Sequence, residues 1–598
     1  MKNRLVQWSA GVTVLATILL IAWGCRPQSN TVQPVDAPDP DLTGPDFFDD
    51  VTPRSGIDFA LRNGEDVAPK NMTILESLGG GIALFDYDGD GLLDVYIPGG
   101  GTFEGPDKKQ ITGLPGRLYK NLGGFKFRDV TAEVGLDQLA GGRPWFYSHA
   151  AAAADYNRSG FPSLLVTGWG RIALFQNVDD GKGGRRFQDV SAEVGLDKGI
   201  TWATSAAWAD LDADGYPDLY VCQYVDWSWS NDPECNYDGK TRDVCPPKKF
   251  DGLQHKLFQN IEGKKFVDIT AEVGLHKGDR NSSKGLGVLI VDVNGDGKPD
   301  IYVANDTVPK FLYINRSSPG KIRLVEEGML SGAACDGSGQ ANGSMGLDAG
   351  DPAGVGQPWL WVTNYENELH ALYKNQCTRD RTFFNFFTPA AGIAAIGQKY
   401  VGWGTGFVDL DHHGWEDLFI VNGHAIRRPT GAERRQKPVL LRNREGRFKD
   451  VSARGGSYFQ APHLARGAAL GDLDNDGNVD AVICHINEPV VVLRNANKTS
   501  NHWLGIALEG KGHADVVGAK VVLEAGGRKQ TRFAKGGGSY ASTPDRRHVF
   551  GLADTGKIDK LTVTWPNGDV QEWSDLSVDR YHVLVQGQKD AREPGAKK

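Results

Sequence analysis

The sequence predicts an all-β protein: a seven-bladed β-propeller followed by a small C-terminal β-rich domain. An aspartate-rich loop of nine residues recurs along residues 47–500. A short apolar segment ending in asparagine follows each copy, and a segment beginning with phenylalanine precedes most copies. Each unit therefore supplies four strands. Units of roughly 40 to 80 residues with four strands are typical of propeller blades, whereas solenoid repeats are mostly shorter and often helical.

The recurring loop has aspartate at positions 1 and 9 and glycine at position 6. In the first copy, Asp86–Asp94, four carboxylates converge because Gly91 permits a sharp turn. Positions 1, 3, 5, the carbonyl of 7, and 9 follow the ligand order of the EF-hand, but position 12 is Ile97 instead of glutamate. Because Ile97 lies in a β-branched and aromatic run, a strand should follow the loop. The loops are predicted to be calcium-binding hairpin turns.

Five copies keep this pattern and predict about four or five structural Ca²⁺ ions per chain. An ordinary Asp-Gly turn explains one copy equally well, but not five copies that share their carboxylates. His413 stands at position 5 of one copy, where a nitrogen ligand suits a hard ion less well. The predicted ligands are Asp86, Asp88, Asp90, Leu92, Asp94; Asp210, Asp212, Asp214, Tyr216, Asp218; Asp292, Asn294, Asp296, Lys298, Asp300; Asp409, Asp411, His413, Trp415, Asp417; and Asp472, Asp474, Asp476, Asn478, Asp480.

Two weaker copies, at 155–163 and 351–356, bring the number of repeats to seven. They lack most ligand positions, so the sequence leaves calcium binding in repeats two and five open. Small residues before the loops, such as Ala150–Ala154, are expected in strands that crowd a central axis. The segment Phe48–Thr52 is expected to help close the ring. The asparagines that follow the loops are Asn121, Asn177, Asn260, Asn315, Asn375, Asn443 and Asn495.

The loops resemble the FG-GAP (VCBS) repeats of integrin alpha-chain propellers and their bacterial relatives. Further along the chain, Gly518-Ala-Lys-Val-Val, Gly536-Gly-Gly-Ser-Tyr540, Phe550-Gly-Leu and Val563-Thr-Trp565-Pro-Asn-Gly568 resemble the ASPIC and UnbV domain. The chain is thus similar to the cartilage acidic protein family from about residue 45 to 590. The resemblance implies a calcium-loop propeller, and implies no particular chemistry.

The N-terminus predicts export. Lys2 and Arg4 precede an apolar run that is too short for an ordinary membrane span, which is typical of a signal peptide. Ile21–Cys25 resembles a bacterial lipobox, which would make Cys25 a lipid attachment site and the protein an envelope-attached lipoprotein. A plain signal peptide or an uncleaved anchor is the alternative. The predicted division is 1–24 signal peptide, 25–46 proline-rich disordered tether, 47–500 propeller, 501–590 ASPIC and UnbV domain, and 591–598 disordered tail.

Six cysteines remain after Cys25, and an even number in an exported protein is compatible with disulfides. Cys235 and Cys245 bracket a polar insertion and are predicted to pair. Cys335 and Cys377 lie in the fifth repeat and are expected to form a second pair. Buried free thiols are expected for the two strand cysteines, Cys222 and Cys484.

The formal charge is −9, and no basic stripe in the sequence suggests a nucleic-acid-binding surface, so no nucleic-acid partner is expected. No Gly-x-Ser-x-Gly, His-Glu-x-x-His, Walker, Cys-x-x-Cys or haem-attachment motif is present. The chain is therefore predicted to be a binding protein more readily than an enzyme, although propeller enzymes assemble their sites from loops distant in sequence.

Polar residues follow the second strand of several units and should gather on the face opposite the calcium turns. Turn chemistry, in which these side chains bond their own backbone, is the alternative to a ligand site. Insertions 98–117 and 222–256 should rise on the same face, either to bind a protein or glycan or to pack against the blades. The candidate ligand residues are Asn305, Asp306, Asn364, Glu366, Asn422, His424, His485 and Asn487.

These features together predict an extracytoplasmic, calcium-binding adhesion or ligand-binding module of the cell envelope, contacting the membrane only through an N-terminal lipid. One alternative is a polysaccharide lyase or hydrolase with its site on the axial face and His424 as an acid or base. A second alternative is a scaffold for an envelope complex, in which residues 501–598 make the contact.

Overall fold

The computed structural model of the protein describes residues 41 and 43–595. Its α-helices are single turns: α1 (Thr52–Ser55), α2 (Gly328–Ser331) and α3 (Ser457–Gln460). Strands dominate, which confirms the all-β class. The predicted signal peptide, Cys25 and the tether up to residue 40 lie outside the described residues. Within the described part of the chain, no helix has the length and apolar character needed to cross a membrane.

Seven antiparallel sheets follow one another within the described part of residues 47–500: six contain four consecutive repeat strands, and the seventh contains three. The seventh is completed by a strand from the start of the chain, since Phe48 pairs with Asn495. This pairing matches the closing role expected for the Phe48–Thr52 segment. The sheets contain β2 (Ala83–Phe85), β3 (Asp94–Ile97), β6 (Arg117–Asn121), β7 (Phe127–Asp129); β8 (Ser148–Ala154), β9 (Ser163–Gly168), β10 (Ile172–Asp179), β11 (Arg185–Asp189); β12 (Ala203–Ala209), β13 (Asp218–Gln223), β16 (Lys256–Ile261), β17 (Lys265–Asp268); β18 (Gly285–Val291), β19 (Asp300–Asn305), β20 (Phe311–Asn315), β21 (Leu324–Glu326); β22 (Ser344–Gly350), β23 (Trp359–Asn364), β24 (Ala371–Asn375), β25 (Phe384–Phe386); β26 (Gly402–Val408), β27 (Asp417–Asn422), β28 (Val439–Arg444), β29 (Arg447–Asp450); and β30 (Ala465–Gly471), β31 (Asp480–His485), β32 (Val491–Asn495), β1 (Phe48–Asp50).

The first strands of the sheets contact one another in a cycle, from β2 through β8, β12, β18, β22 and β26 to β30, which contacts β2 again. These inner strands are almost wholly buried and rich in small residues. Glycine is required where they approach closely, because a Cβ at Gly346 would lie 1.9 Å from the carbonyl oxygen of Trp403 in the next sheet. The small-residue runs are therefore explained by crowding of the inner strands.

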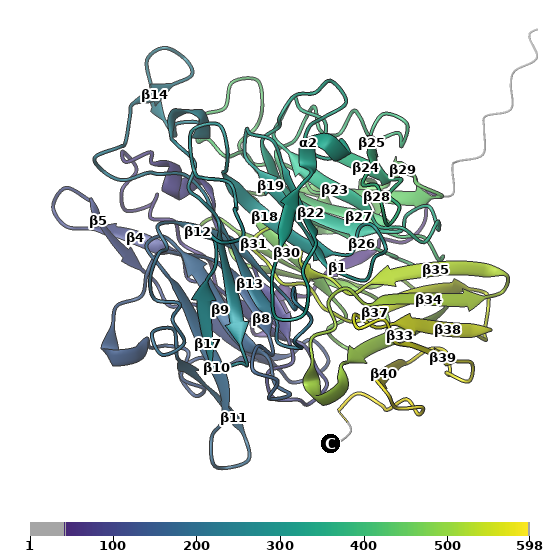
Figure 1. Ribbon diagram of the computed structural model, residues 1–598. Coiled ribbons are helices and arrows are strands. Elements are labelled where there is room, and N and C mark those ends of the chain that lie inside the picture. Colours follow the sequence, from purple (N-terminus) through teal and green to yellow (C-terminus); the bar gives the residue numbers. More distant parts are fainter. Residues whose placement is uncertain (1–40, 42, 596–598) are drawn as a thin grey trace, which may run out of the picture.

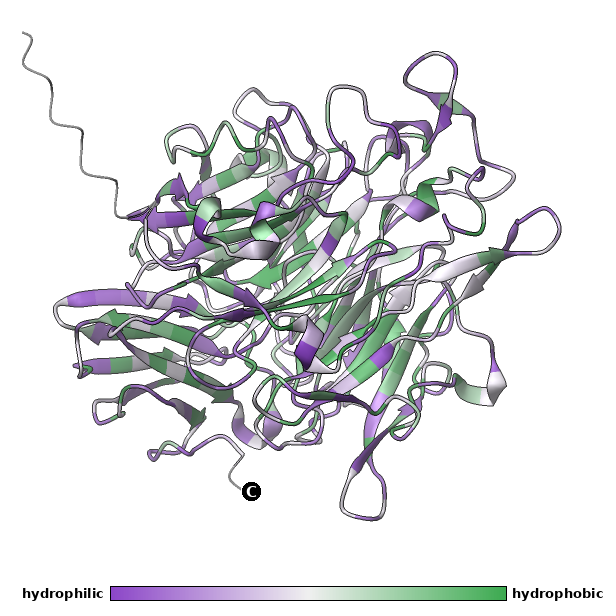
Figure 2. Cartoon of the chain, turned by 180° about the vertical axis from the view of Figure 1, so that it is seen from behind, coloured by the Kyte–Doolittle hydropathy of each residue, from purple (hydrophilic) through white to green (hydrophobic). Residues whose placement is uncertain are grey.

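Buried apolar clusters lie between adjacent sheets. Tyr96 and Phe175, for example, belong to one cluster shared by the first and second sheets. Leu473 and Val95 belong to a cluster shared by the last and first sheets. Figure 2 shows hydrophobic strands and more hydrophilic connections. The core is thus divided into layers, each of which holds two neighbouring sheets together by burial of apolar surface.

The asparagine at or near the end of each third strand links its sheet to the preceding repeat. Its side-chain Nδ2 donates to the backbone carbonyl at position 2 of the aspartate loop in the preceding repeat. Asn121 of the first repeat donates to Leu473 of the last at 2.8 Å, so the series closes on itself. We call these seven bonds the asparagine belt. The other six run from Asn177 to Tyr87, Asn260 to Tyr156, Asn315 to Leu211, Asn375 to Val293, Asn443 to Pro352 and Asn495 to Leu410.

Replacement of Asn315 by alanine is expected to lower the free energy of unfolding by about 2–3 kcal/mol. The fully buried Asn315 amide donates to the carbonyls of Leu211 and Pro299 at 3.0 and 3.1 Å, and both would lose this partner. Urea unfolding followed by tryptophan fluorescence measures the change. Asn567→Ala, which removes an amide from an exposed turn, is the matched control. An equal loss in the two variants would refute a special role for the belt.

The C-terminal domain contains two further sheets. In one, β33 (His502–Glu509) lies between β37 (His548–Ala553) and the parallel β40 (Tyr581–Val585). The other has the order β35 (Arg528–Phe533), β34 (Lys520–Ala525), β38 (Lys560–Thr564) and β39 (Val570–Trp573). A common apolar core lies between them. Residue 592, predicted to belong to the tail, pairs with Val583 and so extends the domain.

The C-terminal domain lies on the face of the sheets that carries the aspartate loops (Figure 1). Arg158 of the second loop donates to the carbonyl of Gly512 at 3.0 Å. Asp515 accepts from the backbone N–H of Asp210 at 3.1 Å. Tyr581 donates its hydroxyl to Asp472 at 2.8 Å. Loops from different repeats are therefore covered and connected by one domain.

Residues 536–543, which we call the axial segment, leave this domain and run between the inner strands. Their first two residues form β36 (Gly536–Gly537), which pairs with β18. Ser539 bridges Leu347 of β22, donates its hydroxyl to Ala468 of β30 and accepts from the backbone N–H of Thr405 of β26. The other three inner strands are contacted by the end of the segment. The backbone N–H of Ala541 donates to the hydroxyl of Ser205 in β12. Thr543 donates its hydroxyl to the carbonyl of Ala151 in β8 and forms a β-bridge with Ala83 of β2. The axial segment therefore contacts all seven inner strands.

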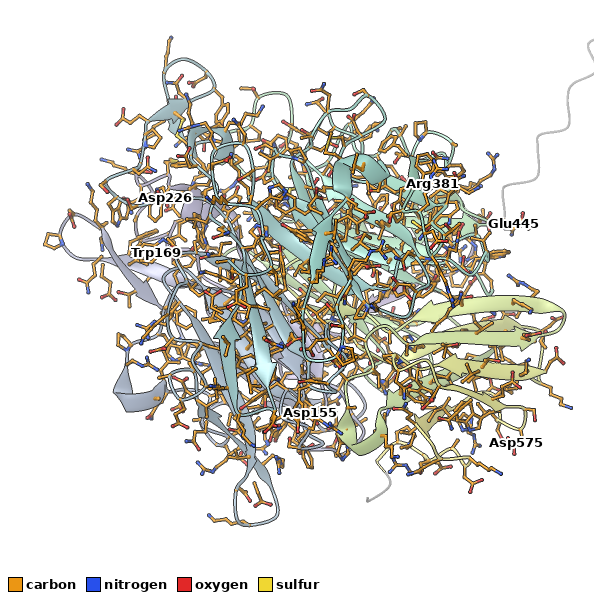
Figure 3. The ribbon with its side chains drawn as sticks, viewed as in Figure 1. Asp155, Trp169, Asp226, Arg381, Glu445 and Asp575 are labelled. Carbon is orange, nitrogen blue, oxygen red and sulfur yellow. A yellow bond between two sulfur atoms is a disulfide. The ribbon has the colours of Figure 1, made fainter. Side chains whose placement is uncertain are left out.

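Two hairpins extend from the sheets: β4 (Gly101–Glu104) with β5 (Gln110–Gly113), and β14 (Cys235–Asn236) with β15 (Arg242–Asp243). Both belong to the insertions identified in the sequence. Figure 1 shows them on the side away from the C-terminal domain. Figure 3 likewise shows Asp226 of the second insertion far from Asp155, the first residue of the second loop.

Candidate functional site

Each aspartate loop joins the first and second strands of its sheet. In the first copy, Asp86 accepts hydrogen bonds from the backbone N–H groups of Gly89 and Gly91 at 2.7 and 2.8 Å. Asp94 accepts from Tyr87 at 3.0 Å and from Asn121 at 2.8 Å. Gly91 has a φ of 89°, which glycine adopts readily. The aspartates at positions 1 and 9 thus fix the shape of the loop through hydrogen bonds from their carboxylates to its backbone.

Four of the five loops bring at least three metal-ligating side chains within 4.8 Å of one another. In three of them, the position-3 aspartates Asp88, Asp212 and Asp474 each have one buried carboxylate oxygen without a hydrogen-bond partner. A buried carboxylate oxygen is unfavourable without a partner. Ca²⁺ prefers oxygen ligands and would supply one. These loops, at 86–94, 210–218 and 472–480, therefore fit a calcium ion.

The loop Asp210–Asp218 fits best, because no lysine or arginine in the described chain forms an ion pair with its aspartates. The oxygen of Asp212 that does have a partner accepts from the amide of Gln259 at 2.6 Å. Burial, together with the neighbouring carboxylates, raises the pKa of Asp210 to about 7. In the other two loops, a cationic side chain on the third strand lies close to the carboxylates. It is Lys120 in the first repeat and Arg494 in the last. Asp210–Asp218 is thus the site with the most uncompensated negative charge.

The loop Asp409–Asp417 also brings four possible ligands together, and it differs from the other three in the cations that it already contains. His413 Nδ1 lies 2.9 Å from Asp409 and 3.0 Å from Asp411, and its Nε2 lies 3.0 Å from the carbonyl of Asn443. Burial disfavours the charged imidazole, yet the carboxylates of Asp417, Asp409 and Asp411 raise its pKa to about 11. Arg442 adds a second cation 2.7 Å from Asp411. The loop therefore holds its own positive charges where a metal ion would bind.

The remaining loops differ from this pattern. In Asp292–Asp300, Asn294 accepts from the backbone N–H of Asp296 at 2.9 Å, and Arg316 lies 3.2 Å from Asp296. In the second and fifth repeats, Asp155 and Asp351 still accept from loop backbone N–H groups. These three loops keep the turn, but they do not gather three carboxylates.

The eight candidate ligand residues do not form one site. Asn305, Asn364 and Asn422 donate their amides to nearby backbone carbonyls, those of Pro309, Leu369 and Lys437. His485 lies against the carbonyl of Pro489 at 2.7 Å and the hydroxyl of Tyr458 at 2.8 Å, and Asn487 donates to Asn63. The turn interpretation therefore fits Asn305, Asn364 and His485, whose partners Pro309, Leu369 and Pro489 are close in sequence, whereas Asn422 and Asn487 bond groups that are distant in sequence.

The other three candidates lie in two partly buried pairs. His424 lies 3.1 Å from Glu366, and Asp306 accepts from the hydroxyl of Tyr224 at 2.6 Å. Burial raises the pKa of Asp306 to about 6. Burial also lowers the pKa of His424, despite the opposing effect of Glu366. The His424 side chain is 0% exposed, so it offers no surface on which a polysaccharide could be bound and cleaved.

The insertions pack on the sheets. Trp227 is buried beside Trp202 and Tyr224 in one apolar cluster, which supports the packing role weighed for these aromatics. Cys235 and Cys245 form the predicted disulfide. The predicted pairing of Cys335 with Cys377 is wrong, because both thiols are free. Cys377 instead lies against the backbone of Phe383, so local packing explains its position. Cys222 and Cys484 are buried free thiols, as expected.

The sequence reasoning missed the contacts that the C-terminal domain makes with the loops and inner strands. The Tyr581 hydroxyl reaches a predicted metal ligand, and Tyr540 is buried among the inner strands. One signal was present: the run Gly536-Gly-Gly-Ser is as rich in small residues as the inner strands that it joins. Small residues on both sides permit close packing of backbones.

Comparison with known proteins identifies two parts of the chain. Residues 155–221 match the FG-GAP-like repeat and residues 509–591 match ASPIC and UnbV. Cartilage acidic protein 1 of Mus musculus is 22% identical over 520 residues, which cover 84% of this chain and 64% of that protein. The Homo sapiens protein is 22% identical over 513 residues, covering 82% and 69%. The chain thus spans less than two thirds of the mouse relative.

Two solved structures are similar at low TM-scores. An Agrocybe aegerita lectin that recognises non-reducing terminal N-acetylglucosamine is 15% identical, with a TM-score of 0.36, over 64% of this chain and 84% of the lectin. A Bacillus licheniformis rhamnogalacturonan lyase is 12% identical, with a TM-score of 0.32, over 90% and 93%. The chain therefore contains an FG-GAP-like repeat and an ASPIC and UnbV domain, and resembles cartilage acidic protein 1 over most of its length.

Proposed function

We propose that the protein is an extracytoplasmic, calcium-binding seven-bladed β-propeller that acts as an adhesion or ligand-binding module of the cell envelope. In this proposal the seven four-stranded sheets are the blades. The cyclic contacts of the inner strands, the asparagine belt and the pairing of β1 with β32 support it. The axial segment occupies the centre, so a partner would bind at the outer surface and not inside the ring.

The observation that carries the calcium proposal is the geometry of Asp210–Asp218. Three carboxylates lie within 4.8 Å, one of their oxygens is buried without a partner, and no lysine or arginine of the described residues forms an ion pair with them. Bound calcium would neutralise these charges and hold the loop against Asp515 of the C-terminal domain. Its role would be structural, fixing the turns on which that domain rests.

The export proposal is supported by the disulfide between Cys235 and Cys245, since disulfides persist in oxidising compartments. The same disulfide fixes an insertion on the face away from the C-terminal domain. Tyr237, at the tip of this insertion, is 42% exposed. Lys109 of the other insertion lies over the ring of Trp229. Exposed aromatic and polar groups on a rigid loop suit a protein or glycan partner, which we propose binds here.

Calcium content tests the proposal directly. Elemental analysis of the purified protein is expected to find about three Ca²⁺ ions per chain, one for each loop that fits. Asp212→Asn should lose about one ion and lower the melting temperature in calcium, because it weakens the best site. Asp411→Asn should lose none, because His413 and Arg442 already neutralise that loop.

A protein without bound calcium, whose melting temperature is unchanged by chelator, would refute the proposal. Loss of an ion in Asp411→Asn would instead restore the fourth loop as a metal site. Both variants should be compared at equal ionic strength, so that a general effect of salt is not mistaken for calcium binding.

A further inference from the structure

Four of the aspartate loops receive a polar side chain from the third strand of their own sheet. The residue that supplies it stands directly before the belt asparagine, and we call it the pre-belt residue. The pre-belt residues of these four repeats are Lys120, Gln259, Arg442 and Arg494. One position in the repeat thus carries a lysine, a glutamine or an arginine.

All four pre-belt residues contact the Oδ2 atom of the aspartate at position 3 of their loop. In the third repeat, Gln259 Nε2 donates to Asp212 Oδ2 at 2.6 Å. The equivalent contacts pair Lys120 with Asp88, Arg442 with Asp411 at 2.7 Å, and Arg494 with Asp474 at 3.4 Å. Each position-3 aspartate is therefore held in place through one of its two oxygens.

The second oxygen of the same aspartate, Oδ1, remains for a cation. In Asp88, Asp212 and Asp474 it is buried and has no hydrogen-bond partner among the described residues. In Asp411 it lies 3.0 Å from His413 Nδ1, so an imidazole stands beside it instead of an ion. Asp212 is only 1% exposed, and a carboxylate oxygen buried to this degree is unfavourable without a partner. The position-3 aspartate thus offers a free oxygen in three loops.

The charge of the pre-belt residue differs among these three loops. Lys120 and Arg494 are cations, so each reduces the negative charge that a Ca²⁺ ion would meet. Gln259 is neutral, so it holds Asp212 by a hydrogen bond and leaves the negative charge of the loop intact. Calcium loops tune their affinity through the charge of the ligands and the rigidity of the site. Both effects favour Asp210–Asp218, in which the position-3 aspartate is held but not neutralised.

We propose that the pre-belt residue sets the calcium affinity of its loop. Gln259 makes Asp210–Asp218 the tightest site, whereas Lys120 and Arg494 make the loops 86–94 and 472–480 weaker sites that fill only at higher calcium. This inference rests on the proposed calcium binding and adds an order of filling to it. The two weaker loops keep their carboxylates paired with a cation when calcium is absent, so the shape of Asp210–Asp218 depends most on the ion.

Isothermal titration of the calcium-depleted protein with calcium chloride, at fixed ionic strength, tests this inference. The wild-type protein should show one tight site and about two weaker sites. Gln259→Lys should weaken the tight site by about ten-fold or more, because it places a positive charge beside the ion. Lys120→Gln should strengthen one weak site by about the same factor. Gln176→Lys is the matched control, because Gln176 is the pre-belt residue of the second repeat, whose loop has Asn157 at position 3. It should keep every affinity within about two-fold.

Unchanged calcium affinities in folded Gln259→Lys and Lys120→Gln proteins would overturn the inference and leave calcium binding itself intact. Sites of equal affinity in the wild-type protein would also overturn it. A wild-type titration without saturable heat would overturn the proposed function, and this inference with it. A gain of affinity in Lys120→Gln cannot come from a damaged fold, so this variant decides the question if Gln259→Lys does not fold. Circular dichroism establishes folding before each titration.

Discussion

Replacement of Tyr540 by alanine is expected to lower the free energy of unfolding of the whole chain by about 3–5 kcal/mol. Tyr540 is 1% exposed, and its ring packs edge-on against Trp403 with centroids 4.8 Å apart. Its hydroxyl donates to the carbonyl of Leu78 at 3.0 Å. Because the axial segment contacts every inner strand, the cavity left by the substitution weakens contacts with several sheets at once. Urea unfolding followed by circular dichroism measures the loss.

Two comparisons separate packing from hydrogen bonding at this position. Tyr540→Phe keeps the ring and should cost only about 1–2 kcal/mol, mostly through the unpaired Leu78 carbonyl. Truncation of the exposed Tyr237 to alanine should cost less than about 0.5 kcal/mol. If Tyr540→Ala behaves like the Tyr237 variant, the axial segment contributes little to stability. Two separate unfolding transitions in the wild-type protein would mean that the domains fold independently.

In calcium-free protein, stability is expected to fall as the pH rises from about 4 to about 7. Burial raises the pKa of Asp210 to about 7 from an ordinary value of 3.8. Between these values the folded state holds a proton that the unfolded state has lost, so the free energy of unfolding decreases with pH. A shift of roughly three pKa units corresponds to about 4 kcal/mol. Calcium replaces the proton, so the stabilisation by calcium should increase with pH.

Urea unfolding at pH 5 and pH 7.5, with chelator and with calcium, measures this dependence. Asp210→Asn removes one of the buried carboxyls whose pKa is raised and should make the curve in chelator less steep. Asp575→Asn, at an exposed carboxylate of the C-terminal domain (Figure 3), should not change it. An equal slope in the wild-type and Asp210→Asn proteins between pH 5 and pH 7.5 in chelator would show that Asp210 is charged in the metal-free fold.

Much of the fold is readable from the sequence because the repeat is local. The loop aspartates, the asparagines and the phenylalanine segments lie in fixed positions on the second, third and fourth strands of each sheet. Each landmark has a local reason: Asp94 bonds two backbone N–H groups, and Asn121 bonds two carbonyls. A repeated local motif therefore predicts the repeated strand pattern without knowledge of long-range contacts.

The candidate sites were less predictable, because they depend on residues far apart in sequence. His413 fits the spacing of a ligand, yet Arg442 on the third strand pairs with a carboxylate of the same loop and neutralises part of its negative charge. Asn305 and Asn422 fit the spacing of a ligand site, yet the amides of both already donate to backbone carbonyls. The docking of the C-terminal domain depends on contacts such as Tyr581 with Asp472, which no spacing rule reveals. Charge and packing across sheets decide these cases.

The pairing of β1 with β32 also decides how the protein would respond to mechanical load. A pull on the N-terminal segment acts first on a strand of only three residues, Phe48–Asp50. Its backbone bonds to β32 would break before those of the longer inner strands, and the seventh sheet would lose its outer edge. Stacking of Phe48 on Phe459 and its edge contact with Phe419 resist that step. The strength of the whole assembly under tension is therefore set by this one short strand.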